Sequence, residues 1–123
     1  MHLPILRLGR TLIVPLPEAL TDSEWQLLRD RILARVGTDR ARGVVIDVSA
    51  MDVMDSYATR VLDGLARMVE LRGATTVVVG VTPQVAFAMS QLGLKLGNAS
   101  TALDLDEALA VLARLQRRPA HAG

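Results

Sequence analysis

Two apolar runs that do not alternate with polar residues most constrain what this chain can fold into. They extend over Val44 to Val48 and over Thr75 to Val81. Strands of this kind lie inside a parallel sheet that is covered on both faces. The segment between them, from about Ser56 to Arg72, carries apolar residues at helical spacing. The sequence therefore predicts a strand–helix–strand unit with parallel strands.

The N-terminal third adds a hairpin and a helix to this unit. Pro4 to Leu8 and Thr11 to Pro15 are β-type runs joined by Gly9-Arg10, a two-residue loop that suits a hairpin. Thr21-Asp-Ser-Glu24 has the form of a capping box, so a helix is expected to follow it. Gly37 is expected to end that helix.

The segment after the second buried run completes the domain. Gln84 to Leu92 is predicted to be a short helix, and the stretch Gly97 to Ala102 to end in a weak last strand. Asp104 is expected to cap a final helix. The predicted fold is a single α/β domain, in which an N-terminal hairpin and parallel strands form a mixed sheet covered by about four helices. We expect this domain over residues 1–113 and a flexible tail over residues 114–123.

Composition excludes several functions. Fourteen basic and thirteen acidic residues give a net charge of +1, so no whole-chain field draws the protein to nucleic acid or to an anionic membrane. Three aromatic residues do not make a base-stacking platform, and the absence of cysteine excludes disulfides and thiolate sites. No apolar run reaches the roughly 18 residues that span a bilayer. Arg7 and Arg10 interrupt the N-terminus before a signal-peptide core develops, so we expect a cytoplasmic protein.

The candidate site lies where the first buried run ends. Asp47 follows the run, Asp52 and Asp55 lie in a short loop, and Ser56 opens the next helix. A hydroxyl is thus expected at a helix N-terminus, in reach of solvent and among carboxylates. Either Ser56 caps the helix, or Asp55 caps it while Ser56 occupies the first turn.

The residues around Ser56 do not favour catalysis. A serine nucleophile needs a neighbouring base, yet His2 and His121 lie in segments expected to be mobile. Nothing places Lys95, the single lysine, beside the serine. The sequence Asp55-Ser-Tyr-Ala58 is not a G-x-S-x-G elbow. We therefore expect a protein that is not an enzyme.

Cofactor and metal sites are not predicted either. The chain contains neither of the glycine motifs that bind dinucleotides or nucleoside triphosphates, and a helix stop plus a turn explains Gly93 to Gly97. Asp47, Asp52 and Asp55 could offer oxygens to a hard cation, but exposed loop acids are the favoured interpretation. A phosphoacceptor role for Asp47, as in receiver domains, lacks the acidic pair and the lysine that receivers need. We expect no cofactor and no metal.

A reversible phosphate on Ser56 is the remaining hypothesis. The phosphate would meet unpaired backbone N–H groups and the positive end of the helix dipole, each worth about 0.3–1 kcal/mol. Asp52 and Asp55 would repel a group that carries about −1.5 to −2 charges. Because these effects partly cancel, the phosphate is expected to change a binding surface rather than the fold of the domain. From the residues alone, a plain capping role remains the preferred interpretation.

The order of residues in this region resembles the STAS domain family of sulfate transporters and anti-sigma-factor antagonists. Ile46-Asp-Val-Ser49 ends the buried strand, a loop with spaced hydrophobic residues follows, and Asp55-Ser56 starts the helix; the hydrophobic residues are Met51, Val53 and Met54. The resemblance extends over about Pro4 to Leu112. Tyr57 directly after the serine is similar to the stressosome branch and departs from the simple sporulation antagonists.

The resemblance implies a non-catalytic scaffold that forms homo- and hetero-oligomers with STAS-domain paralogues. It also implies that the scaffold holds a serine kinase of the GHKL ATPase class and releases it when Ser56 is phosphorylated. The residues expected to border the kinase footprint are Asp47, Asp52, Asp55, Tyr57 and Arg60. Tyr57 is either an anchor for the kinase or a half-buried staple on its own helix. Thr59 is not assigned as a second acceptor.

Two other roles within the family stay open. One is a direct antagonist that binds an anti-sigma factor in a small heteromer. The other is a subunit of a lipid-transport ABC complex, which would co-purify with a membrane ATPase.

Overall fold

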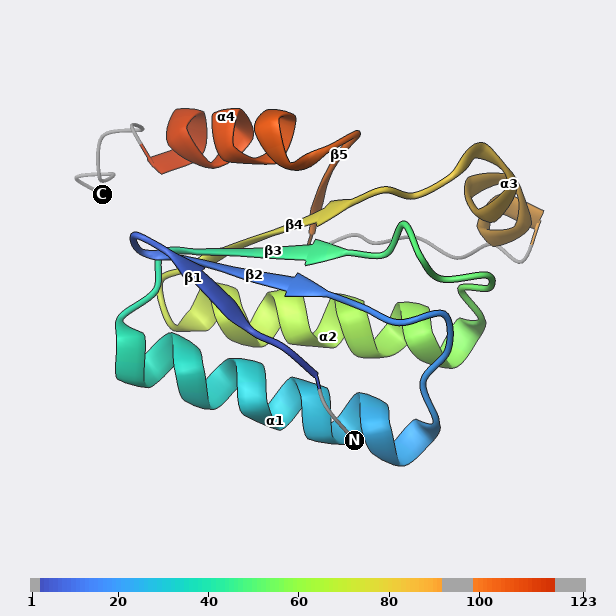
Figure 1. The fold of residues 1–123 in the computed structure, drawn as a ribbon, viewed down its shortest axis with the longest axis horizontal. Coiled ribbons are helices and arrows are strands. Elements are labelled where there is room, and N and C mark those ends of the chain that lie inside the picture. The colour runs from blue at the N-terminus through green and yellow to red at the C-terminus, as the bar shows by residue number, and fades with distance from the viewer. Residues whose placement is uncertain (1–2, 92–98, 117–123) are drawn as a thin grey trace.

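A five-stranded mixed sheet forms the centre of the molecule (Figure 1). The computed structural model describes residues 3–91 and 99–116. Across the sheet the strands follow chain order: β1 (Leu6–Leu8), β2 (Thr11–Pro15), β3 (Gly43–Asp47), β4 (Thr75–Val79) and β5 (Ser100–Ala102). β1 pairs with β2 in antiparallel orientation, and the other neighbours are parallel. The predicted α/β fold with an N-terminal hairpin is confirmed.

Helices cover both faces of this sheet. α1 (Asp22–Asp39) and α2 (Ser56–Leu71) lie side by side on one face, and α4 (Leu105–Gln116) lies across the other (Figure 1). α3 (Pro83–Gln91) lies beyond the end of β4. The predicted end of α3, at Leu92, is outside the described residues.

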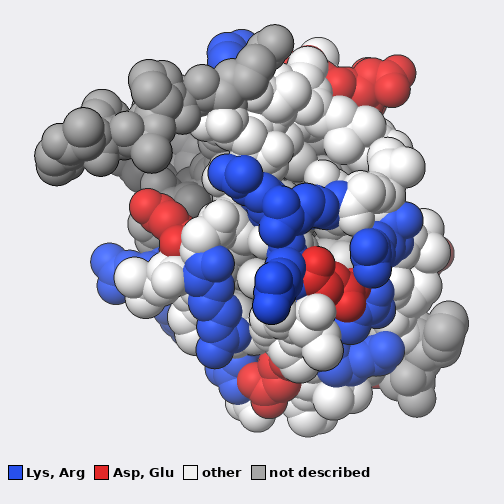
Figure 2. Space-filling model, turned by 90° about the vertical axis from the view of Figure 1, so that its left-hand side faces the viewer, with Lys and Arg blue, Asp and Glu red and all other residues white. Residues whose placement is uncertain are grey.

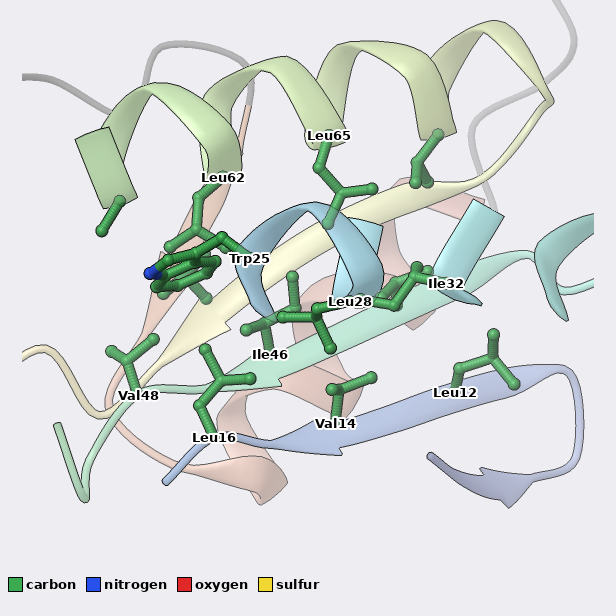
Figure 3. Close-up of a cluster of buried hydrophobic side chains, with 14 of the residues drawn as sticks. Leu12, Val14, Leu16, Trp25, Leu28, Ile32, Ile46, Val48, Leu62 and Leu65 are labelled. Atoms are coloured by element: carbon green, nitrogen blue, oxygen red, sulfur yellow. The ribbon is translucent and has the colours of Figure 1, made fainter. Parts of the chain in front are cut away.

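The two covered faces explain why β3 and β4 are apolar without alternation. Val44 and Ile46 point into a large core beneath α1 and α2, whereas Val45 points into a smaller core beneath α4. In β4 the neighbours Val77 and Val78 divide between the two cores in the same way. Figure 3 shows the larger core, where Trp25 and Leu28 of α1 and Leu62 and Leu65 of α2 face strand residues such as Leu12, Val14 and Ile46.

The start of α1 follows the prediction, but its end does not. Thr21 accepts a hydrogen bond from the Glu24 N–H at 3.2 Å, and the Glu24 side chain accepts one from the Thr21 N–H at 2.8 Å, which confirms the capping box. The prediction that Gly37 ends the helix is wrong. The helix continues to Asp39, and Arg40 takes the left-handed conformation with φ 50°.

The last helix is also longer than predicted. Asp104 caps it as expected, because its Oδ1 accepts a hydrogen bond from the Glu107 N–H at 2.9 Å. α4 extends to Gln116, so residues 114–116, predicted to belong to a tail, are helical. The remaining tail residues, 117–123, are outside the described residues.

Candidate functional site: a serine at the start of α2

Asp55, rather than Ser56, caps α2. The Asp55 Oδ1 accepts a hydrogen bond from the Ala58 N–H at 2.8 Å, and its carbonyl oxygen accepts bonds from the N–H and the hydroxyl of Thr59. Of the two arrangements left open by the sequence, the structure has the one in which Ser56 occupies the first turn. The Ser56 side chain is exposed, and its hydroxyl makes no hydrogen bond to another described residue.

Three hydrogen bonds hold the loop before Ser56. The Asp47 Oδ1 accepts a hydrogen bond from the Ser49 N–H at 2.9 Å, which turns the chain at the end of β3. The Val48 N–H donates to the Val79 carbonyl oxygen at 2.9 Å, and the Asp52 N–H donates to that of Glu18 at 3.3 Å. The loop is therefore attached to the segment that follows β2 and to the last residue of β4.

Gly80 lets the chain after β4 approach this loop. It has φ +82°, and a Cβ atom added there would lie 2.6 Å from the Ser49 Cβ. Such a separation is not tolerated between carbon atoms, so only glycine fits without a shift of one of the two segments. The position of the loop thus depends on a residue that lies more than twenty positions further along the chain.

The residues predicted to border a kinase footprint fall into three groups. Asp52 and Asp55 line one hollow of about 320 Å³ together with Glu18 and Trp25. Tyr57 and Arg60 line a second hollow of about 250 Å³, on the side of α1. Asp47 lines neither of these hollows and is half-buried in the turn that it stabilises. The site is thus a surface around Ser56 rather than an enclosed pocket.

Tyr57 is attached to the neighbouring helix. Its side chain is half-buried against the larger core, and its hydroxyl oxygen accepts a hydrogen bond from the Gln26 side chain of α1 at 3.2 Å. Tyr57 therefore makes the contacts of a half-buried staple, although it joins α2 to α1 and does not contact its own helix alone. Thr59 is buried, with 2% of its surface exposed, and its hydroxyl donates to Asp55, which agrees with leaving it unassigned as an acceptor.

Val53 is a feature of the site that the sequence did not single out. Its side chain is 67% exposed, whereas Met51 and Met54 on either side are buried. Val53 lines both the hollow next to Asp55 and a small one of about 110 Å³ next to α3. In the sequence these three apolar residues look alike, so no signal distinguished the one that faces solvent.

Residues 3–91 and 99–116 contain neither a cluster of metal-ligating side chains nor a helix that could span a membrane. Within those ranges no three side chains of the ligand types come together as a metal site would need. The helices there are all too short or too polar to cross a bilayer. The cytoplasmic location stays a prediction.

These features define a small α/β domain that presents an exposed serine at the carboxyl edge of its parallel strands. The chain belongs to the STAS domain family, whose family model matches residues 3–108. A search of curated protein sequences gave no match.

Solved structures support this assignment. The chain is similar to RsbS of Moorella thermoacetica, in a form with a serine-to-glutamate substitution, with 34% identity and a TM-score of 0.81 over 95% of this chain and 99% of that one. A chain of the stressosome, described as a signal integration and transduction hub, is 36% identical with a TM-score of 0.78, over 93% of this chain and 99% of its own length. The unphosphorylated antagonist SpoIIAA is 14% identical with a TM-score of 0.67, over 94% of this chain and 99% of that one, and shows only the shared fold.

Proposed function

We propose that this chain is a non-catalytic stressosome scaffold that acts as an antagonist by holding a serine kinase, and that phosphorylation of Ser56 releases the kinase. The kinase is of the GHKL ATPase class, and the scaffold assembles with STAS-domain paralogues into a large particle. Similarity to RsbS and to a stressosome chain, both above 30% identity, supports the branch of the family.

One observation supports Ser56 as the acceptor more than any other. Asp55 provides the helix cap, and the exposed Ser56 hydroxyl makes no hydrogen bond to another described residue that esterification would break. A phosphate there would lie near the N–H groups of the first turn, which have no intrahelical partner. The domain would therefore tolerate the modification, and the change would act on the surface that a partner contacts.

The proposed kinase footprint combines charge and apolar contact. Asp52 and Asp55 give the surface its negative charge, and exposed Val53 lies between them in the chain. An apolar contact surrounded by complementary charge is typical of an interface centre and its rim. A phosphate on Ser56 would add about −1.5 to −2 charges next to exposed Val53 and these carboxylates, so it would disrupt the contact through the cost of desolvating the phosphate and through repulsion from Asp52 and Asp55.

Phosphorylation by the cognate kinase tests the acceptor. The purified protein, incubated with that kinase and ATP, is expected to carry one phosphate, which mass spectrometry should map to Ser56. Ser56→Ala should abolish it. Ser23→Ala is the matched control, because Ser23 is also an exposed serine in the first turn of a helix at the same edge of the sheet. Phosphate on Ser23, or its persistence in Ser56→Ala, would contradict the proposal.

Kinase retention tests the release step. Ser56→Asp should weaken binding of the kinase by about tenfold, or ~1.4 kcal/mol, whereas Ser23→Asp should leave it unchanged. The two alternative roles predict other results. A direct antagonist would give a small heteromer in light scattering, and a transporter subunit would co-purify with a membrane ATPase whatever the state of Ser56.

A further inference from the structure

Four arginines gather at the edge of the sheet opposite Ser56. Arg10 precedes β2, Arg40 and Arg42 precede β3, and Arg72 precedes β4. Because these three strands are parallel, the residues before them meet at one edge of the sheet. All four arginines are exposed and line one open hollow of about 620 Å³. We call them the arginine cluster; Figure 2 shows blue side chains gathered on this side of the molecule.

No carboxylate of the described residues lines this hollow. Its other lining residues are apolar or small: Val36, Gly37, Ala41 and Gly73. The acids nearest in the chain to Arg40 and Arg72 are Asp39 and Glu70. Neither lines the hollow, and Asp39 is already engaged by Arg35 at 2.8 Å. The net charge of +1 for the whole chain therefore conceals a local excess of positive charge.

The ends of two helices account for part of this charge. α1 and α2 both end at this edge of the sheet, so the negative ends of their dipoles lie there. Each helix end carries about −0.5 charge, and the two together offset about one of the four positive charges. The Arg10 Nε donates a hydrogen bond to the Arg40 carbonyl oxygen, and the Arg72 Nη1 donates one to that of Leu33, both at 3.3 Å. Arg10 and Arg72 thus also stabilise the end of α1.

Arg40 and Arg42 have no comparable structural role. Their side chains make no hydrogen bond or ion pair with another described residue. Arg40 also takes φ 50° and ψ 46°, a conformation in which glycine is relaxed and a residue with a Cβ atom is strained. The chain thus carries a guanidinium group where the helix end alone would be better served by glycine. Such strain indicates a use for the side chain beyond ending the helix.

We propose that the arginine cluster binds an oligophosphate, a linear anion of linked phosphates. A guanidinium group donates two parallel hydrogen bonds to neighbouring phosphate oxygens. Four such groups, spread over three loops, match an anion with more oxygens than a single phosphate offers. The hollow of about 620 Å³ is within the size range of small-ligand sites. Binding would neutralise the charges that otherwise repel one another.

Nucleic acid fits the hollow less well. No aromatic side chain of the described residues lines it, so bases would find no stacking platform. For the same reason a nucleoside triphosphate would be held through its phosphate chain. The ligand chemistry is therefore the chain of phosphates, whether it is free or part of a nucleotide. The site lies at the edge of the sheet away from Ser56, and binding there does not depend on the kinase.

Isothermal titration calorimetry of the full chain with tripolyphosphate tests the site. The wild-type protein is expected to bind one tripolyphosphate per chain, at least about tenfold more tightly at about 0.02 M salt than at about 0.2 M, since salt screens exposed charges. Arg40→Gly, which suits the backbone, and Arg42→Gln should each weaken binding at least about fivefold, because charge-assisted hydrogen bonds are lost. Both variants should keep the melting temperature of the wild type. Arg31→Gln is the matched control, because Arg31 is an exposed arginine on α1 outside the cluster, and it should change nothing.

Two further ligands measure the specificity of the site and identify the source of the phosphate chain. Inorganic phosphate should bind at least about tenfold more weakly than tripolyphosphate, because it engages fewer guanidinium groups. ATP that binds more tightly than tripolyphosphate would identify a nucleotide as the ligand, and ATP that binds equally or more weakly would identify a free oligophosphate. Equal affinities for inorganic phosphate and tripolyphosphate would overturn the proposal, as would the absence of binding at low salt.

Amide chemical shifts locate the ligand without any substitution. Titration of isotope-labelled protein with tripolyphosphate should shift the amide signals of Arg40, Arg42 and Arg72 and leave that of Ser56 unchanged. Shifts confined to the first turns of the helices would assign the anion to helix N-termini and overturn the proposal. So would wild-type affinity in both Arg40→Gly and Arg42→Gln.

Discussion

At the scale of single residues, two neighbouring side chains of the site have different roles: one stabilises the start of α2 and the other is exposed to solvent. Asp55 makes hydrogen bonds that hold the first turn of α2, and Ser56 makes none with another described residue. The two positions are adjacent in the chain, and both residue types are good caps. The sequence therefore left both arrangements open, and the extended backbone at Asp55, with φ −78° and ψ 179°, decided between them.

A pair of substitutions at the start of α2 tests whether Asp55 alone caps the helix. Asp55→Ala should lower the free energy of unfolding by about 1 kcal/mol, because it removes the cap. Ser56→Ala should change it by less than about 0.5 kcal/mol, as should the control Asp52→Ala in the same loop. Urea denaturation measures all three. An equal loss in Ser56→Ala and Asp55→Ala would show that the serine shares the capping role.

At the scale of elements, the loop from residue 48 to residue 55 is positioned by segments distant in the chain. Gly80 after β4 approaches Ser49, and Glu18 after β2 accepts the Asp52 N–H. The sequence predicted β3 before the loop and α2 after it, since their apolar patterns are local. It could not predict which loop residues face solvent, because that depends on contacts between β2, β3 and β4 at one edge of the sheet.

Two glycines with almost the same backbone separate the effect of this contact from that of conformation. Gly80 and Gly73 have φ +82° and +84°, but a Cβ atom at Gly73 would meet no atom within 4 Å. Gly73→Ala should therefore cost about 1 kcal/mol from conformation alone. Gly80→Ala should cost about 1–3 kcal/mol more, because the added carbon displaces Ser49. Thermal melts compare the two, and equal losses would rule out a tight contact at Ser49.

At the scale of the whole molecule, one sheet separates two cores of different size. The larger lies beneath α1 and α2 and contains Trp25, and the smaller lies beneath α4 and contains Leu112. β3 and β4 contribute to both cores. A loss of packing on one face of the sheet is therefore expected to destabilise the other face as well. The described part of the chain should unfold as one unit.

Leu112→Ala tests whether unfolding is cooperative across the two cores. The substitution should cost about 2–5 kcal/mol, because it leaves a cavity in the smaller core. Trp25, the only tryptophan, reports on the larger core, whereas far-ultraviolet circular dichroism reports on all helices. Both signals should shift to lower urea by the same amount. A shift in circular dichroism alone would show that α4 unfolds independently.

The sequence by itself determined the parallel strands, the order of the helices, the capping box at Thr21, the cap at Asp104 and the place of Ser56, because each depends on a pattern within a few neighbouring residues. Only the tertiary structure decided that α1 passes Gly37 and ends at Arg40, and that Val53 is exposed while Met51 and Met54 are buried. The position of the loop from residue 48 to residue 55 is of the same kind. It arises because parallel strands bring all their amino ends to one edge and all their carboxyl ends to the other, and no local pattern encodes that.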